Sequence, residues 1–511
     1  MNVFLMFRDR DFDVQQEAPC HAGALTQDLG LDTLFTVMAG GDKFLHEVAQ
    51  KAVLLSVTDV ATIIYRQHIL RDCLEHPAVV KEIYDLCVEC IQNERRRFWG
   101  GLSSSPGMIL YRSVEVLHMY VENLRKLRRI ADTESAGFNS GGFKRFFAMI
   151  REELGDAYFA EVQDHLKRLR FKGGVLVSAE LGRGNKGVNY TLRRPDDREV
   201  GWFAPILTNP IFTHKPAYTF HIADRDEAGF RALSELRDKG INLAANALAR
   251  SNDHILSFLK ALRTELAFYI GCRNLHQQLT ERGGASCFPT PIEPGERRQS
   301  FTGLYDGSLA LSMDRRVNGN DVDADGKALV IITGANQGGK STFLRSIGLA
   351  QVMMQCGMFV PARSFRAEVC SAIFTHFKRE EDTTMRSGKF DEELSRMSGI
   401  ADKIGAGALL LFNESFASTN EREGSEIARQ IVRALLEARV RIFFVTHQFD
   451  FAHSIYMENL PGALFLRAER RPDGARTFRM IAGEPLDTSY GEDLYRKIFV
   501  PAAARTVQEV P

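Results

Sequence analysis

Apolar residues recur every three or four positions through residues 26–130, a spacing that predicts helices with one buried face. The spacing is clearest in two groups: Leu31, Leu34, Phe35 and Met38, and then Leu117, Val121, Leu124 and Leu127. Clusters of Gly, Ser, Asn and Pro interrupt the pattern at 103–107 and again at 136–142. A further helix is predicted over 143–169, with an interruption near Gly155.

The pattern changes after residue 170. Residues 174–179 and 188–193 are typical of strands, with the turn Gly182-Arg-Gly-Asn between them, and residues 218–222 are another strand candidate. Helical spacing returns over 228–279. A loop rich in Gly and Pro, residues 281–294, then suggests a domain boundary.

From about residue 300, buried strands alternate with helices, a pattern that predicts an α/β domain with a largely parallel sheet. The predicted elements are a strand at 328–333, a helix at 342–355, a strand at 408–412, a helix at 421–438 and a strand at 441–446.

Composition narrows the function classes. The chain has 511 residues, enough for about three domains at roughly 100–200 residues each. Lys plus Arg and Asp plus Glu both number 65, so the formal net charge is zero. A protein that holds nucleic acid constitutively by charge is usually basic, so any DNA binding here is expected to be local, weak or gated.

The eight cysteines are scattered, unlike a secreted disulfide framework, and we expect a cytoplasmic protein. Cys87 and Cys90 form a single CxxC, which suggests either a zinc or redox role or two buried thiols in a reducing cytosol. The N-terminal apolar run is too short for a signal peptide, and no stretch of 18 apolar residues suggests a membrane span.

The strongest chemical signal is the run Gly334-Ala-Asn-Gln-Gly-Gly-Lys340-Ser341, which follows a predicted strand and opens a predicted helix. In this context the run predicts a P-loop that binds ATP. Glycines let backbone N–H groups turn toward a phosphate chain, and the helix N-terminus adds partial positive charge. Lys340 is expected to reach the β- and γ-phosphates, and the Ser341 hydroxyl to ligate Mg²⁺. The candidate nucleotide-binding residues here are Gly334, Asn336, Gly338, Gly339, Lys340, Ser341 and Thr342.

Two later strand ends carry candidate catalytic residues. The apolar strand ending in Asn413-Glu414 fits a Walker B segment, in which Glu414 orients or deprotonates the attacking water. Asn413 stands where an aspartate usually supports Mg²⁺, so it is the second candidate metal residue. Thr446-His447 ends the next strand, and His447 is expected to contact the γ-phosphate. The alternatives are an ordinary strand terminus and a structural histidine.

The small polar turn Arg386-Ser387-Gly388-Lys389-Phe390 opens a predicted helix, so Ser387 and Gly388 are candidates for a second anion-binding site, or for a capped surface helix. Basic clusters occur at 95–97 and at 125–129, with acidic residues around them. These clusters either contact DNA or form solvated helix faces.

Taken together, these segments resemble the MutS family of DNA mismatch repair ATPases. The segments that carry the resemblance are Ile331–Phe343, Gly357–Ala362, Phe374–Phe377 with Asp382, Asn413–Asn420, Thr446-His447 and Ser489-Tyr-Gly491. Upstream, Leu34–Phe44, Tyr65-Arg-Gln, Asp72-Cys-Leu and Leu259–Leu279 are similar to the helical core of the family, and the strands near 174–222 to a reduced clamp.

The sequence departs from the family pattern at three points. Asn413 replaces the usual aspartate, and Gly388 stands where the signature serine is expected, with Ser387 beside it. Core-like sequence begins near residue 30, which leaves no room for the N-terminal mismatch-reading domain with its Phe-x-Glu wedge. The tripeptides Phe159-Ala-Glu161 and Phe390-Asp-Glu392 match the wedge but stand in other contexts.

The resemblance implies a multidomain fold in which an all-α core and lever, with a small β-containing insertion, precedes an α/β P-loop ATPase domain of the ABC type. The expected segments are an N-terminal tail at 1–25, the helical core at 26–170, the clamp-like insertion at 171–227, a helical return at 228–290 and the ATPase domain at 291–511.

The resemblance also implies a homodimer through the ATPase domains, in which ATP with Mg²⁺ closes the dimer against the partner's Ser387–Leu394 loop and hydrolysis opens it. The expected partner is double-stranded or branched DNA, without mismatch reading by this chain. Two alternatives stay open: an ATP-binding scaffold with little hydrolysis, and an ABC-type ATPase that acts on a non-DNA partner.

Overall fold

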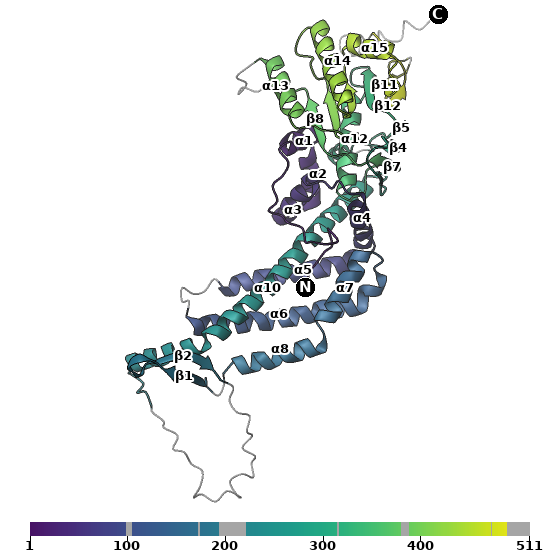
Figure 1. Ribbon diagram of the computed structural model, residues 1–511. Helices are drawn as coiled ribbons and strands as arrows, with labels where there is room; N and C mark the ends of the chain where they lie inside the picture. Colours follow the sequence, from purple (N-terminus) through teal and green to yellow (C-terminus); the bar gives the residue numbers. More distant parts are fainter. Residues whose placement is uncertain are drawn as a thin grey trace, which may run out of the picture. The chain divides into compact units, whose positions relative to one another are not determined.

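The computed structural model describes residues 1–98, 105–171, 174–193, 221–313, 316–379, 388–471 and 473–487. The chain divides into two compact units, each built from separate stretches of sequence (Figure 1). The first unit comprises residues 1–2, 82–136 and 146–263, and the second comprises residues 3–81, 137–145 and 264–511. Residues 218–220 of the strand expected at 218–222 lie outside the described residues, and residues 221 and 222 are not part of a strand.

Helices form most of the first unit. They are most of α5 (Pro77–Phe98), α6 (Pro106–Glu134), part of α7 (Gly141–Glu153), α8 (Asp156–Leu169) and the first part of α10 (Glu227–Glu281). The predicted interruption near Gly155 is confirmed, because this glycine is the extended N-cap of α8. The predicted inward stripe of α6 is confirmed as well, since its leucine and valine side chains are 0–6% exposed: Leu117, Val121, Leu124 and Leu127.

A small antiparallel hairpin also belongs to the first unit. It consists of β1 (Val177–Leu181) and β2 (Gly187–Leu192), with a short 3-10 turn at Arg183–Asn185 between them. The two predicted strands and the turn between them are confirmed. Their side chains are mostly exposed, so the hairpin contributes little to a core.

The N-terminal segment, expected to be a tail, packs into the second unit. Leu5 and Met6 are fully buried. The buried carboxylate of Glu265, on α10, accepts backbone N–H groups from this segment, at 2.6 Å from Leu5 and 2.7 Å from Phe12. Backbone groups leaving water need partners, and Glu265 supplies them where no strand or helix does. Four helices follow: α1 (Ala22–Leu29), α2 (Leu31–Ala39), α3 (Lys43–Leu54) and α4 (Val60–Glu75).

A six-stranded sheet, in the order β12-β11-β6-β10-β9-β8, forms the centre of the second unit. Its strands are β6 (Leu329–Gly334), β8 (Ile373–Phe377), β9 (Leu409–Asn413), β10 (Arg441–Val445), β11 (Ala463–Arg470) and β12 (Arg476–Ala482). All neighbouring pairs are parallel except β11 with β12. The largely parallel sheet predicted from the sequence is therefore confirmed. The helices between these strands are α12 (Lys340–Gln355), α13 (Lys389–Ala401), α14 (Glu421–Glu437) and α15 (Phe449–Met457).

A second, four-stranded sheet has the order β3-β7-β4-β5. Its strands are β3 (Thr290–Ile292), β4 (Gln299–Leu304), β5 (Asn320–Asp323) and β7 (Ser364–Glu368), and the short helix α11 (Gly307–Ser312) follows β4. The Gly- and Pro-rich loop predicted as a boundary thus contributes an edge strand, β3.

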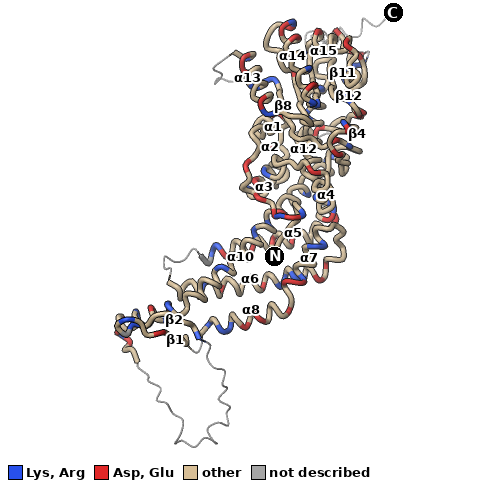
Figure 2. Tube along the Cα trace, in the orientation of Figure 1, with Lys and Arg blue, Asp and Glu red and all other residues tan. Residues whose placement is uncertain are grey.

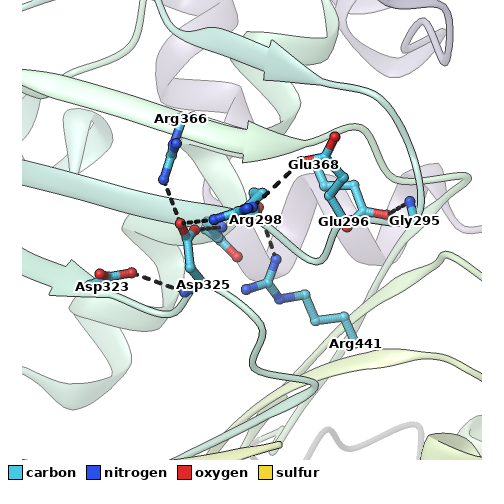
Figure 3. A network of polar contacts seen from close by, with 9 residues as sticks. Gly295, Glu296, Arg298, Asp323, Asp325, Arg366, Glu368 and Arg441 are labelled. Atoms are coloured by element: carbon cyan, nitrogen blue, oxygen red, sulfur yellow. Dashed lines mark hydrogen bonds and ion pairs between the residues drawn. The ribbon is translucent and has the colours of Figure 1, made fainter.

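Charged groups connect the two sheets (Figure 3). Asp325 receives Arg366 at 2.5 Å and Arg298 at 3.2 Å. Arg441, at the start of β10, donates to the carbonyls of Arg298 at 3.2 Å and Ala324 at 2.8 Å. Because Arg441 binds backbone directly before β4 and directly after β5, it fixes the smaller sheet against the amino end of the parallel one.

Candidate functional site

The glycine-rich loop lies between β6 and α12, as predicted, and its glycines are sterically required. Gly334 has φ +105°, which disfavours any residue with a Cβ. A Cβ on Gly338 would lie 2.6 Å from the Ala468 Cβ and 2.8 Å from the Ala335 oxygen. The loop therefore closes tightly against β11 and presents backbone rather than side chains at the start of α12.

Lys340 is the first residue of α12 and is only 5% exposed. Its ammonium group donates to the carbonyl oxygens of Gly334 at 2.9 Å and Ala335 at 3.1 Å. Burial lowers the pKa of Lys340 to about 8, with Glu414 raising it and Arg476 lowering it. A cation held in so little water is matched by an anion, and the phosphate chain of a nucleotide fits this requirement.

Ser341 and Asn413 meet at the ends of α12 and β9. The Ser341 hydroxyl donates to the Asn413 side-chain oxygen at 2.9 Å. The two residues expected to support Mg²⁺ are thus adjacent, and both offer the oxygen ligands that Mg²⁺ prefers. Neither carries a negative charge, and no group of three or more His, Cys, Asp or Glu suited to a metal occurs among the described residues.

Glu414 and His447 form a hydrogen-bonded pair, a contact that the motif analysis did not anticipate. The His447 Nε2 lies 2.8 Å from the Glu414 Oε1. This hydrogen bond is the main cause of a lowered pKa at Glu414, which burial opposes. Glu414 follows β9 and His447 follows β10, and these strands are parallel neighbours. Strand adjacency was the signal that would have predicted the pair.

A cavity of about 980 Å³ lies beside these groups, although the predicted site residues Gly334 and Asn413 are not among those that line it. The expected residues that line it are Asn336, Gly338, Gly339, Lys340, Ser341, Thr342, Glu414 and His447. Its other walls come from segments without a recognised motif, including Asp306, Met313 and Phe478. Phe478 lies on β12, whose contact with the loop depends on the sheet order and leaves no mark in the local sequence.

The second anion-binding candidate lies apart from this cavity within the chain. Gly388 is the exposed N-cap of α13, with no atom within 4 Å of an added Cβ. Asp391 and Glu392 occupy the first turn, where their charges already complement the helix dipole. Ser387 lies outside the described residues.

A buried polar bridge connects α13 with the segment after β9, and no motif in the sequence indicated it. His376, on β8, is fully buried; its Nδ1 lies 2.7 Å from the Ser415 hydroxyl and its Nε2 lies 3.0 Å from the Glu393 carbonyl. The Ser418 hydroxyl donates to the Glu393 carboxylate at 3.1 Å. Burial lowers the pKa of His376 to about 4, so the ring is neutral near pH 7.

The basic residues proposed for DNA contact mix with acidic ones along the helices of the first unit (Figure 2). Arg128 pairs with Asp132 at 3.0 Å and also donates to the Leu154 carbonyl at 2.9 Å. Arg125 lies over the ring of Phe159, 5.1 Å from its centroid. Part of the 125–129 cluster is therefore engaged within the unit. Cys87 and Cys90 are buried free thiols.

No helix of the described ranges is long and apolar enough to cross a membrane. Together, the glycine-rich loop, the buried lysine and the paired strand-end residues define a multidomain helical and α/β protein with a site suited to a phosphate chain.

Comparison with known proteins gives the family. Residues 58–282 match the model of the MutS2 N-terminal domain, and residues 330–509 match that of MutS domain V. The MutS protein homolog 4 of Mus musculus is 32% identical over 143 residues, which are 28% of this chain and 15% of that protein. The DNA mismatch repair protein MutS of Petrotoga mobilis is 30% identical over 174 residues, 34% of this chain and 21% of that protein. The DNA mismatch repair protein MutS of Leptospira interrogans is 30% identical over 181 residues, which are 32% of this chain and 21% of that protein. The chain belongs to the MutS family, and the matched segments span about a fifth or less of these relatives.

Proposed function

We propose that this chain is an ATPase of the ABC type that binds ATP at the glycine-rich loop and uses it to gate DNA binding. One observation carries the proposal. The buried Lys340, the Ser341–Asn413 pair and the Glu414–His447 pair come from the carboxyl ends of three adjacent parallel strands and border one loop. Ligands of open α/β sheets bind at this edge.

In this proposal the glycine-rich loop binds the phosphates of ATP, and the residues at the strand ends carry out hydrolysis. Lys340 exchanges its carbonyl partners for the β- and γ-phosphates, a charge-assisted contact. Glu414, whose pKa is lowered by His447, is ionised at neutral pH and accepts the proton of the attacking water. His447 orients that carboxylate through the 2.8 Å hydrogen bond and offers its ring to the γ-phosphate.

Mg²⁺ bound by the Ser341 hydroxyl, with Asn413 supporting it through water, would neutralise charge on the phosphates. The neutral amide of Asn413 already accepts the hydrogen bond of Ser341, so it preserves the orientation of that hydroxyl. It contributes no negative charge of its own, and the affinity for Mg²⁺ is expected to be lower than with a carboxylate.

The proposed assembly is a homodimer through the ATPase domains. Gly388 is exposed and unobstructed at the start of α13. A surface that contacts the nucleotide of a partner has to be open in this way. Ser387 and Gly388 would then contact the γ-phosphate bound at the partner's loop. The buried bridge through His376 and Glu393 gives this helix a direct connection to the segment that bears Glu414.

The proposed partner is double-stranded or branched DNA. DNA as the partner is supported by relatives that are named DNA mismatch repair proteins. The formal net charge of zero favours DNA binding gated by ATP over constitutive DNA binding. The test measures phosphate release and DNA affinity in parallel, with ATP, ADP or no nucleotide. ATP turnover together with a DNA affinity that differs at least about tenfold between ATP and ADP states is expected. Turnover without any nucleotide effect on DNA would contradict gating.

One observation favours a second candidate, an ATP-binding scaffold with little hydrolysis. Asn413 removes the negative charge that normally stands beside Mg²⁺, and nothing among the described residues that line the cavity replaces it except Glu414 and Asp306. Tight ATP binding with less than about one turnover per hour, while ATP still changes DNA affinity, would select this candidate over the ATPase.

A further inference from the structure

A second pocket, rich in arginine, lies next to the cavity of the glycine-rich loop. It has a volume of about 730 Å³ and a single acidic residue among those that line it, Glu469. Six arginines line it: Arg282, Arg316, Arg363, Arg471, Arg476 and Arg479. None of residues 334–342 does, so the pocket is separate from the loop, although the two cavities share a wall that includes Asn318 and Phe478.

Separate elements bring these arginines together. Arg282 follows α10, Arg363 precedes β7, and the hairpin of β11 and β12 supplies Arg471, Arg476 and Arg479. Such convergence from distant parts of the sequence differs from a run of basic residues along one helix, which is normally a solvated face. Like charges so gathered repel one another unless an anion compensates them.

Acidic partners compensate only part of this charge. Arg363 pairs with Asp321 at 3.3 Å, and Arg282 donates to the side chain of Gln278 at 2.8 Å. Within the described ranges, Arg316, Arg471 and Arg479 have no carboxylate partner.

The wall of the pocket also holds a buried polar group without a partner. Tyr305 is only 5% exposed, and its hydroxyl finds no hydrogen bond among the residues that the structure describes. Buried hydroxyls normally have a partner, since leaving one unpaired costs roughly 1–3 kcal/mol. Tyr305 lines the same pocket as the arginines, but its hydroxyl is closed off from solvent, so the exposed Arg316, Arg471 and Arg479 are the groups that a ligand with several oxygen acceptors would contact.

We propose that this pocket binds a small molecule with two or more phosphate groups. Arginine forks match phosphate oxygens in bidentate geometry, which favours phosphate over a single carboxylate. The volume lies within the roughly 300–1,000 Å³ typical of small-molecule sites. A concave pocket bounded on several sides suits such a ligand better than the extended backbone of duplex DNA, which binds along an open basic surface. The proposal is independent of ATP binding at the glycine-rich loop.

The test is calorimetric titration of the full chain with inorganic tripolyphosphate. The Lys340→Ala background weakens binding at the glycine-rich loop, so that the arginine pocket dominates. One equivalent of tripolyphosphate is expected to bind, and adding Arg471→Gln with Arg479→Gln should weaken it at least about tenfold, or 1.4 kcal/mol. Arg439→Gln, an exposed arginine outside the pocket, is the matched control and should leave the affinity unchanged.

Three results would overturn the proposal. One is no binding in the Lys340→Ala background, and another is binding that the two pocket substitutions leave unchanged. The third comes from a duplex DNA arm: if the same substitutions weaken DNA binding tenfold while tripolyphosphate does not bind, the arginines contact nucleic acid. A failure of Lys340→Ala to weaken ATP binding would contradict the proposed function alone, because the pocket substitutions still report on tripolyphosphate.

Discussion

At the scale of single residues, Lys340 carries its charge where little water reaches it. Within the described ranges, two backbone carbonyls, those of Gly334 and Ala335, accept its ammonium protons, and burial lowers its pKa to about 8 although the charge of Glu414 opposes this shift. Two carbonyl dipoles compensate a full charge poorly. A phosphate chain is therefore expected to stabilise the protonated lysine and to gain affinity from it.

Replacing this lysine tests the nucleotide site. Lys340→Ala should remove a charge-assisted phosphate contact of about 1.5–3 kcal/mol, and ATP affinity should fall at least about tenfold. Calorimetry on protein with an unchanged circular dichroism spectrum measures this, and Lys403→Ala, an exposed lysine outside the Ser387–Leu394 loop, serves as the control. Unchanged ATP affinity would remove the glycine-rich loop as the nucleotide site.

In the proposed mechanism, Glu414 is the base and its hydrogen bond with His447 positions it. Glu414→Gln keeps the shape and leaves ATP binding intact, but it removes the proton acceptor, so turnover should slow by roughly 100-fold or more. The variant should also accumulate as an ATP-bound dimer on size-exclusion chromatography, because closed ATPase domains do not reopen without hydrolysis. Wild-type turnover in Glu414→Gln would exclude this residue as the base.

His447→Ala tests whether the histidine acts through Glu414. Loss of the hydrogen bond should raise the pKa of Glu414 and move the acid limb of the pH–rate profile to higher pH.

A substitution of Asn413 tests the effect of a negative charge beside the proposed Mg²⁺ site. Asn413→Asp should tighten Mg²⁺ binding by adding a negative charge near Ser341, and ATPase activity at limiting Mg²⁺ should rise. The measurement is phosphate release across a Mg²⁺ titration, with Asn420→Asp as a control at an exposed helix cap. If activity at limiting Mg²⁺ does not rise, the site has adapted to the amide, and the expected cost of the departure is wrong.

At the scale of elements, the sequence pattern predicted the helices, strands and breaks that depend on neighbouring residues. The alternation of strand and helix after residue 328 and the break at Gly155 follow from periodicity and backbone punctuation, and both are present. The contact of Phe478 with the loop, the Glu414–His447 pair and the His376 bridge depend on strand order, which periodicity does not specify. The N-terminal segment looked polar enough for a tail, because the buried acceptor that fixes it, Glu265, lies some 250 residues away.

The bridge between α13 and the segment after β9 predicts a pH dependence of stability. The pKa of His376 is about 4 in the folded protein and about 6.5 when unfolded, so the unfolded chain binds more protons between these values. Stability from the neutral ring is fully present above pH 6.5 and is lost as pH falls to 4, by up to about 3 kcal/mol. Glu265 acts in the opposite direction, because burial raises its pKa to about 7 and its contribution is lost as pH rises.

The contribution of His376 is isolated by comparing the stability of the wild type with that of a His376 variant. The free energy of unfolding of wild type minus that of His376→Gln, from urea titrations at pH 4.5 to 7.5, should decrease as the pH is lowered, since Glu265 contributes equally to both. His68→Gln, a substitution of an exposed histidine, is measured in parallel as the control. A flat profile for His376→Gln would show that the ring is not held neutral by burial.

At the scale of the whole molecule, zero net charge argues against strong constitutive binding to DNA. What DNA binding remains has to come from local groups, and basic and acidic residues are mixed along the helices of the first unit (Figure 2). Arg128 and Arg125 are partly engaged by neighbours within that unit. Contacts from such a surface reach phosphates, which carry no sequence or mismatch information.

Mismatch reading requires an aromatic wedge that unstacks a base step, and neither Phe-x-Glu tripeptide supplies one. Phe159 is only 5% exposed and lies against Arg125, while Phe390 packs against the core beside the parallel sheet. Neither ring is free to enter a base stack without breaking its own packing. The described residues therefore favour binding that depends on ATP and salt but not on base pairing.

We therefore expect this chain to bind homoduplex and single-mismatch duplex within about twofold of each other, and to lose affinity steeply with added salt. Fluorescence anisotropy at several salt concentrations, with matched duplexes of one length and with ATP or ADP, measures both quantities. Phe159→Ala is the informative variant: a packed ring predicts lower stability with the same matched-to-mismatched ratio, whereas a wedge predicts a loss of mismatch affinity alone. A mismatch preference of roughly tenfold, about 1.4 kcal/mol, would reveal a reader among other residues of the chain. Absence of DNA binding at low salt in every nucleotide state would instead favour an ATPase that acts on a non-DNA partner.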